Sequence, residues 1–216
     1  MDGQGYMWWI REWLQKNTNG RPNMINWQTC SNIEMDGVLW KNSPMYHITY
    51  HQTQNCYMHD MEIFVDIMGQ LEISKLFSKY IGWEAEVIDL IPGLDLKLEL
   101  PTFPLNTDGF DIWGRNMTFR RIKITNFDDA IVPKPTYSSP GNLFNCTEDI
   151  YSEDIETWYT VGMTIGSVPP HGGENCVRNV VFKNVHMHKP LKGIYVKSNP
   201  GTSGTGLIKN ITYENF

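Results

Sequence analysis

A short polar-apolar pattern recurs along this chain at nearly constant intervals. Each copy starts with Asn or Asp, continues with an apolar residue, and has a second apolar residue five places later. The last three intervals between starting residues are 33, 30 and 31 residues. Repeats of this length with short β segments are typical of solenoids and propellers. The five copies begin at Asn32, Asn116, Asp149, Asn179 and Asn210.

The segments within each repeat favour a solenoid over a propeller. Residues 180–182 and 193–196 are short, apolar and β-branched, and polar turns separate such pieces. One coil cannot bury its own apolar face, so coils stack and their inward side chains form a continuous column. A recurring Asn can hydrogen-bond to its equivalent in the next coil. We therefore expect an all-β fold, a single right-handed parallel β-helix domain over residues 1–216.

Two stretches depart from the repeat. Residues 6–15 have the apolar spacing of a short N-terminal helix or cap. Residues 70–104 predict an insertion between coils, with a helix at 71–77 and an alternating strand at 94–100. The chain stops at Phe216 inside a repeat, so we expect a partial β-helix without a C-terminal cap.

Charge and composition exclude several classes of partner. The net charge of -6 argues against non-specific nucleic-acid binding. No apolar run reaches the roughly 18 residues that a membrane-spanning helix needs, and residues 1–5 lack the features of a signal peptide. The four cysteines are widely spaced without a C-x-x-C pair, so we expect no zinc site. One or two disulfides remain possible, and their pairing stays open.

Acidic residues concentrate in two motifs, N-T-D-G-F-D at 106–111 and N-F-D-D-A at 126–130. Asp in a lone D-G dipeptide usually makes a turn. The pair Asp128 and Asp129 is less ordinary, because adjacent strand residues face opposite sides and one side is the packed core. An unpaired charge there would be costly. Either both carboxylates turn outward at a bend, or one is buried and matched.

The spacing of the motifs indicates a chemical role. The D-D pair lies about one coil after Asp108, so stacking would place the three carboxylates side by side. Hydrolysis of a sugar–sugar bond needs an acid for the leaving oxygen and a carboxylate that activates water. Like charges held close together raise the pKa of one of them, which suits a general acid.

Five blocks carry a resemblance that covers most of the chain. They are R-P-N-M-I-N-W at 21–27, G-V-L-W-K-N-S-P at 37–44, N-T-D-G-F-D at 106–111, I-T-N-F-D-D at 124–129 and G-M-T-I-G-S-V at 162–168. In content and order they resemble glycoside hydrolase family 28, the polygalacturonase (pectinase) family. The resemblance implies a secreted, monomeric enzyme that cuts a galacturonan-like pectic polysaccharide.

The resemblance also implies roles for individual residues. Asp128 would be the general acid, and Asp108 and Asp129 would hold and deprotonate the water. Inversion at the sugar carbon requires acid and base about 6.5–9.5 Å apart. Lys197, Tyr195 and Asn106 would bind substrate. No metal and no other cofactor is implied.

Three positions differ from the family pattern. Val161 replaces the His of G-H-G, Tyr195 replaces the Arg of R-I-K, and Ala130 stands where the family has a Cys. Losing one cation should weaken the grip on a substrate carboxylate, while Tyr195 offers a ring on which a sugar can stack. The adjacent subsite could then take a less charged sugar. The alternative from another class is a non-catalytic β-helix that binds carbohydrate or has lost its activity.

Overall fold

The computed structural model describes residues 1–13, 20–67, 69, 104–170, 173–201 and 203–216. The helix and strand expected within 70–104 lie outside the described residues. The described elements are α1 (Tyr6–Trp13), β1 (Ile25–Gln28), β2 (Ser31–Asp36), β3 (Leu39–Lys41), β4 (Ile48–Phe64), β5 (Phe110–Thr125), β6 (Ile131–Pro133), β7 (Thr147–Trp158), β8 (Met163–Val168), β9 (Glu174–His188), β10 (Ile194–Ser198) and β11 (Thr205–Glu214).

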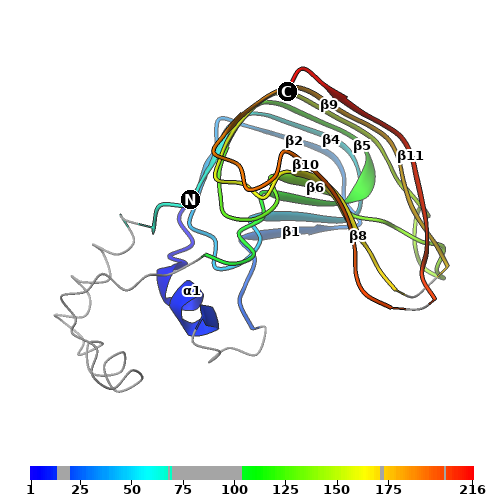
Figure 1. Cartoon of the computed structure of the whole chain (residues 1–216), viewed down its shortest axis with the longest axis horizontal. Coiled ribbons are helices and arrows are strands. Elements are labelled where there is room, and N and C mark those ends of the chain that lie inside the picture. The colour runs from blue at the N-terminus through cyan, green and yellow to red at the C-terminus, as the bar shows by residue number, and fades with distance from the viewer. Residues whose placement is uncertain (14–19, 68, 70–103, 171–172, 202) are drawn as a thin grey trace.

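The strands form a parallel β-helix, as expected. The main sheet has the order β1-β4-β5-β7-β9-β11, with β2 and β3 also paired to β4 and with β6 paired to β5. A second sheet joins β8 and β10, and every pairing between these strands is parallel. Figure 1 shows the long strands curving side by side around a common interior, each lying on the coil before it.

The two apolar positions of the repeat form columns inside the coils. Met117 pairs with Ile150, which pairs with Val180 in the next coil, and all three side chains are buried. The second position repeats this arrangement with Ile122 and Ile155. The sequence repeat therefore corresponds to the stacking of successive coils around one core.

The polar starting residues form a ladder along the outside of the turn. Asn116 donates from Nδ2 to Oδ1 of Asn55 at 2.8 Å, and Asn210 donates in the same way to Asn179 at 3.1 Å. These residues have φ between 52° and 58°, in the left-handed region that Asn tolerates better than most residues. Asn55 belongs to a coil that the sequence pattern alone did not identify. The predicted structural role of these Asn residues is confirmed.

The N-terminal helix α1 is also present. Its residues Tyr6, Trp9 and Ile10 pack with Val65 in a cluster of their own beside the end of β4. The indole Nε1 of Trp9 donates to the carbonyl of Ser43 at 3.0 Å. The helix therefore covers a corner where coils turn. In the described part of the chain, no helix is long and apolar enough to cross a membrane.

One disulfide links successive coils. Cys146 before β7 is bonded to Cys176 in β9, 30 residues later, while Cys30 and Cys56 are not bridged. The sequence left this pairing open. The bond ties the loop that follows β6 to the next coil.

Backbone hydrogen bonds between coils align the segments that precede β5, β6 and β8. Gly109 N–H donates to the carbonyl of Asp129 at 2.9 Å, and Ala130 N–H donates to the carbonyl of Gly162 at 3.0 Å. Residues at the starts of these strands are therefore neighbours on one face of the β-helix, although they are far apart in sequence.

Candidate active site

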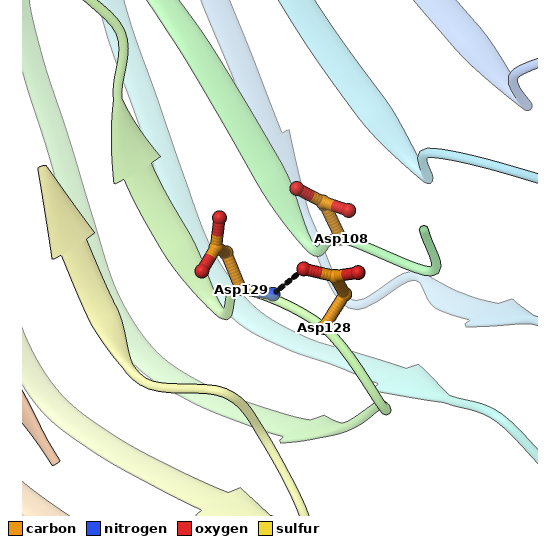
Figure 2. Close-up of side chains that lie close together, drawn as sticks. All are labelled: Asp108, Asp128 and Asp129. Atoms are coloured by element: carbon orange, nitrogen blue, oxygen red, sulfur yellow. Dashed lines mark hydrogen bonds between the residues drawn. The ribbon is translucent and has the colours of Figure 1, made fainter. Parts of the chain in front are cut away.

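The structure brings Asp108, Asp128 and Asp129 together on that face. One carboxylate oxygen from each lies within 4.8 Å of the other two. Figure 2 shows the three carboxyl groups side by side at the ends of neighbouring backbone segments. Adjacent parallel strands lie about 4.8 Å apart, so residues on neighbouring coils come this close by stacking alone.

Asp129 is the buried and matched member of the D-D pair. Its side chain is fully buried, and its Oδ1 accepts a 2.6 Å hydrogen bond from the hydroxyl of Thr164 in β8. Its Oδ2 accepts a hydrogen bond from the ammonium of Lys197 in β10. The sequence left open whether both carboxylates turn outward or one is buried beside a partner, and Asp129 is buried beside partners. Lys197 therefore contacts a carboxylate of the site itself.

Asp128 is only partly buried and faces the pocket. Its Oδ1 accepts from the N–H of Asp129 at 2.9 Å (dashed in Figure 2), and its Oδ2 accepts from the N–H of Asn106 at 3.2 Å. Burial, and then the charge of Asp129, raises the pKa of Asp128 above its ordinary value. A raised pKa favours a carboxyl group that can give up a proton during a reaction.

The main chain of Asp128 is held from the next coil. Its carbonyl accepts hydrogen bonds from the hydroxyl of Thr160 at 2.8 Å and from the N–H of Val161 at 2.9 Å. The position where the family carries His therefore lies against the backbone of Asp128. The contact that Val161 supplies comes from its main chain and would be kept by any residue except proline.

Asp108 is held by a histidine that sequence reasoning missed. The carbonyl of Asp108 accepts from the N–H of His47 at 2.9 Å and lies 3.0 Å from its ring Nδ1. The other ring nitrogen accepts from the N–H of Ser43 at 3.4 Å, so Nδ1 carries the proton. Burial lowers the pKa of His47 to about 4, so the ring is neutral at pH 7. His47 fixes the backbone at Asp108 without adding charge.

A fourth carboxylate and a second lysine complete the charged cluster. Lys134 Nζ lies 3.3 Å from Oδ2 of Asp111 and 3.8 Å from Oδ2 of Asp108. Burial raises the pKa of Asp111 to about 6. Burial, and then the charge of Asp111, raises the pKa of Asp108 well above its ordinary value. The sequence feature that could have identified Lys134 is its position directly after the apolar run I-V-P, one coil beyond Asp111.

Asp108, Asp128, Lys134 and Lys197 line a pocket of about 450 Å³. Its walls mix carboxylates, lysines and aromatic rings, a lining that suits a sugar with polar edges and an apolar face. The lining residues include Tyr46, Asn106, Asp108, Trp113, Asp128, Lys134, Tyr137 and Lys197. The lysine ammonium groups supply positive charge beside the closely spaced carboxylates.

The three residues expected to bind substrate are placed differently from one another. Lys197 and Asn106 line the pocket, and the side-chain oxygen of Asn106 accepts from Arg21 Nη2 at 2.6 Å. Tyr195 is not among the residues that line this pocket, and Lys192 Nζ lies 3.4 Å from the centre of its ring. It is paired in register with Thr164, whose coil follows that of Asp129, so Tyr195 lies two coils from Asp129. Tyr195 therefore lies beside the pocket.

The three carboxylates approach one another closely. Their nearest oxygens lie within 4.8 Å, whereas the roughly 6.5–9.5 Å of an inverting pair is the separation of two whole carboxyl groups. The reason is local: Asp128 and Asp129 are adjacent in sequence, and Asp108 lies on the neighbouring coil. A water activated here would lie over the group of carboxylates.

Comparisons with known proteins agree with this architecture. The family model described as "Glycosyl hydrolases family 28" matches residues 1–216. A probable endo-xylogalacturonan hydrolase A of Aspergillus fumigatus is 26% identical over 219 residues, which cover 100% of this chain and 44% of the relative. A probable rhamnogalacturonase C of Aspergillus flavus is 26% identical over 215 residues, covering 100% of this chain and 35% of the relative.

Solved structures show the same fold. The polygalacturonase of Erwinia carotovora ssp. carotovora superposes with a TM-score of 0.71 at 21% identity, over 99% of this chain and 48% of that protein. The endo-xylogalacturonan hydrolase of Aspergillus tubingensis gives 0.68 at 18% identity, over 99% and 48%. The chain thus spans less than half the length of these relatives.

Proposed function

This chain belongs to glycosyl hydrolases family 28, and from that membership we propose that it hydrolyses glycosidic bonds in a pectic polysaccharide. The observation that carries the proposal is the convergence of Asp108, Asp128 and Asp129, of which Asp108 and Asp128 line one pocket. The relatives named above act, by their names, on xylogalacturonan, rhamnogalacturonan and polygalacturonan. The substrate proposed here is a polymer of that class, met outside the cell by a monomeric enzyme.

In the proposed mechanism Asp128 is the general acid. It faces the pocket, and its raised pKa keeps a proton available for the leaving oxygen. Asp108 and Asp129 hold a water molecule over the sugar carbon, and an ionised carboxylate takes its proton as the water attacks. Lys197 binds Asp129 and lines the pocket, so it is placed between this base and the substrate.

The test compares sugar release from three polymers. Wild-type protein and an Asp128→Asn variant are incubated with polygalacturonic acid, xylogalacturonan and rhamnogalacturonan, and new reducing ends are measured. Lys183→Met, a change at a distant ion pair with Glu214, serves as the control. We expect release from at least one polymer with wild type and with the control, and almost none with Asp128→Asn. Wild-type protein that is folded and releases sugar from no polymer would contradict the proposal.

The anomer formed first tests the stereochemical course. Proton NMR during the first minutes of hydrolysis distinguishes inversion from retention. We propose inversion, from the family resemblance. Formation of the retained anomer would contradict the proposed course.

A second candidate function is carbohydrate binding without cleavage. The observations that favour it are Val161 and Tyr195 at the family's His and Arg positions. Calorimetric titration with oligosaccharides from the same polymers separates the two functions. Binding by wild-type protein without any sugar release would support the binder.

A further inference from the structure

Lys134 lies in contact with two buried carboxylates on the neighbouring coil. Only about 12% of its side chain is exposed, and Asp111 and Asp108 beside it are 0% and 4% exposed. Its Nζ lies nearer to Asp111, at 3.3 Å, than to Asp108, at 3.8 Å. The nitrogen also lies 5.8 Å from the centres of the Tyr46 and Trp113 rings, so an aromatic wall limits its movement.

The positive charge of Lys134 compensates the negative charge of the buried carboxylates beside it. A buried carboxylate is strongly disfavoured in its ionised form unless a partner compensates the charge. Asp108 and Asp111 are three residues apart on one segment, and the charge of Asp111 raises the cost of ionising Asp108. The titratable groups that face Lys134 or Asp108 are Asp111, Asp128, Asp129 and Tyr46, and the neutral ring of His47 contacts the backbone of Asp108.

Resting on the proposed function, we propose that Lys134 is a positioning residue whose charge favours the ionised form of Asp108, the form able to take a proton from the attacking water, while Asp111 holds the lysine in place. The ammonium group does not have to touch the sugar for this role. It acts through Asp108, and its own position depends on the ion pair with Asp111. Lys197 has the corresponding place beside Asp129, on the other side of the site.

The consequence of removing the charge can be stated with its sign. Without the cation, ionised Asp108 loses an attractive partner at 3.8 Å, so its pKa rises further. A base must be ionised to act, so the acidic limb of the activity profile moves to higher pH. A residue that only filled space would lower activity at every pH and leave this limb unmoved.

The experiment uses Lys134→Met, with Lys134→Arg to restore the charge and Lys183→Met as a control. Carbon-13 NMR follows the aspartate carboxyl signals against pH, with Asp108→Asn and Asp111→Asn spectra for assignment. For Lys134→Met we expect the Asp108 midpoint, and the acidic limb of kcat/KM, to rise by at least about one pH unit. For Lys134→Arg and the control we expect much smaller shifts.

An unmoved Asp108 midpoint in folded Lys134→Met would overturn the inference, whatever happens to the rate. If Lys134→Met does not fold, Lys134→Gln takes its place with the same expectation, because its amide can donate to the carboxylates without a charge. The NMR titration needs no turnover. Failure of the proposed hydrolysis would therefore show as wild-type protein without activity, while the carboxyl titration still decides the role of Lys134.

Discussion

The hydroxyl of Thr164 donates a 2.6 Å hydrogen bond to Oδ1 of Asp129 from the coil that follows it. Both side chains are fully buried, so no solvent competes for the carboxylate oxygen. This bond uses Oδ1 and the ammonium of Lys197 bonds to Oδ2, so each oxygen keeps a lone-pair site for another donor. The orientation of this carboxylate therefore depends on two strands, β8 and β10, that sequence distance alone would not connect with it.

The first prediction concerns this bond. Thr164→Val keeps the shape of the side chain and removes the donor, leaving a buried carboxylate oxygen unsatisfied. A hydrogen bond to a charged group contributes about 1.5–3 kcal/mol. We expect kcat/KM on the preferred polymer to fall about 10- to 100-fold. Thr164→Ser, which keeps the hydroxyl, should retain most of the activity, and equal activity of the Val and Ser variants would contradict the role given to the bond.

The second prediction concerns the acid and the base. Asp128→Asn and Asp108→Asn remove the ability to exchange a proton while keeping the size of each side chain. Because general acid–base catalysis contributes about 10²- to 10⁴-fold, we expect kcat to fall by that range in each variant. Circular dichroism and melting temperature should stay close to wild type. Wild-type rates in either variant would remove that residue from the mechanism.

The third prediction concerns pH and His47. Its pKa is about 4 in the folded protein, against about 6.5 when unfolded, because burial disfavours the charged ring. The unfolded chain therefore binds the extra proton first. Stability should be lost as pH falls from about 6.5 to about 4, by roughly 3 kcal/mol in total from this group.

Urea unfolding at pH 7, 5 and 4 measures this contribution. In His47→Gln the amide can still donate and accept, but it does not titrate. We expect the free energy of unfolding to decline less steeply in the variant than in wild type. Parallel declines would show that His47 is not the titrating group.

The fourth prediction concerns the Asn ladder. Asn179 has φ of 54°, donates to Asp149 at 2.9 Å and accepts from Asn210. Asn179→Ala loses these bonds and puts Ala, which tolerates the left-handed region less well than Asn, at this position, at a cost of about 1–3 kcal/mol. Asn179→Gly loses the same bonds but tolerates the backbone conformation. Urea unfolding should therefore rank wild type, then Gly, then Ala; a Gly variant less stable than Ala would reject the backbone argument.

The fifth prediction concerns the disulfide. Cys146 and Cys176 close a loop of about 30 residues, for which chain entropy predicts about 3–4 kcal/mol of stabilisation. A Cys146→Ala/Cys176→Ala double variant should unfold at correspondingly lower urea concentration. A Cys30→Ala variant is the matched control, because this cysteine is not bridged, and it should unfold near the wild-type midpoint. Equal midpoints for the double variant and the control would show that the bridge adds little.

The sequence predicted the features that repeat. Asn116 and Asn210 occupy the same position in different coils and have the same structural role there. The spacing of such residues therefore predicted how the coils stack and which side chains point inward. Stacking then placed Asp108 beside the D-D pair with no further information. Coil length was less regular near Asn55, and that coil was missed.

Residues that act through a single contact were harder to find. His47 contacts a backbone carbonyl, and Lys134 owes its position to ion pairs with Asp111 and Asp108, so neither follows a periodic pattern. Tyr195 was expected to bind substrate because of its place in a motif. Its ring lies beside the described pocket, two coils from Asp129, a displacement that only the register of β8 and β10 reveals.

Beyond Lys134, the segment between β6 and β7 supplies Pro135 and Tyr137 to the pocket wall, whereas the acids are fixed by hydrogen bonds from coil to coil. These two parts of the site can change independently. A longer or shorter segment beyond Lys134 would alter which branched or unbranched chain fits, while the reactive centre keeps its geometry. The architecture thus separates the evolution of substrate preference from the preservation of chemistry.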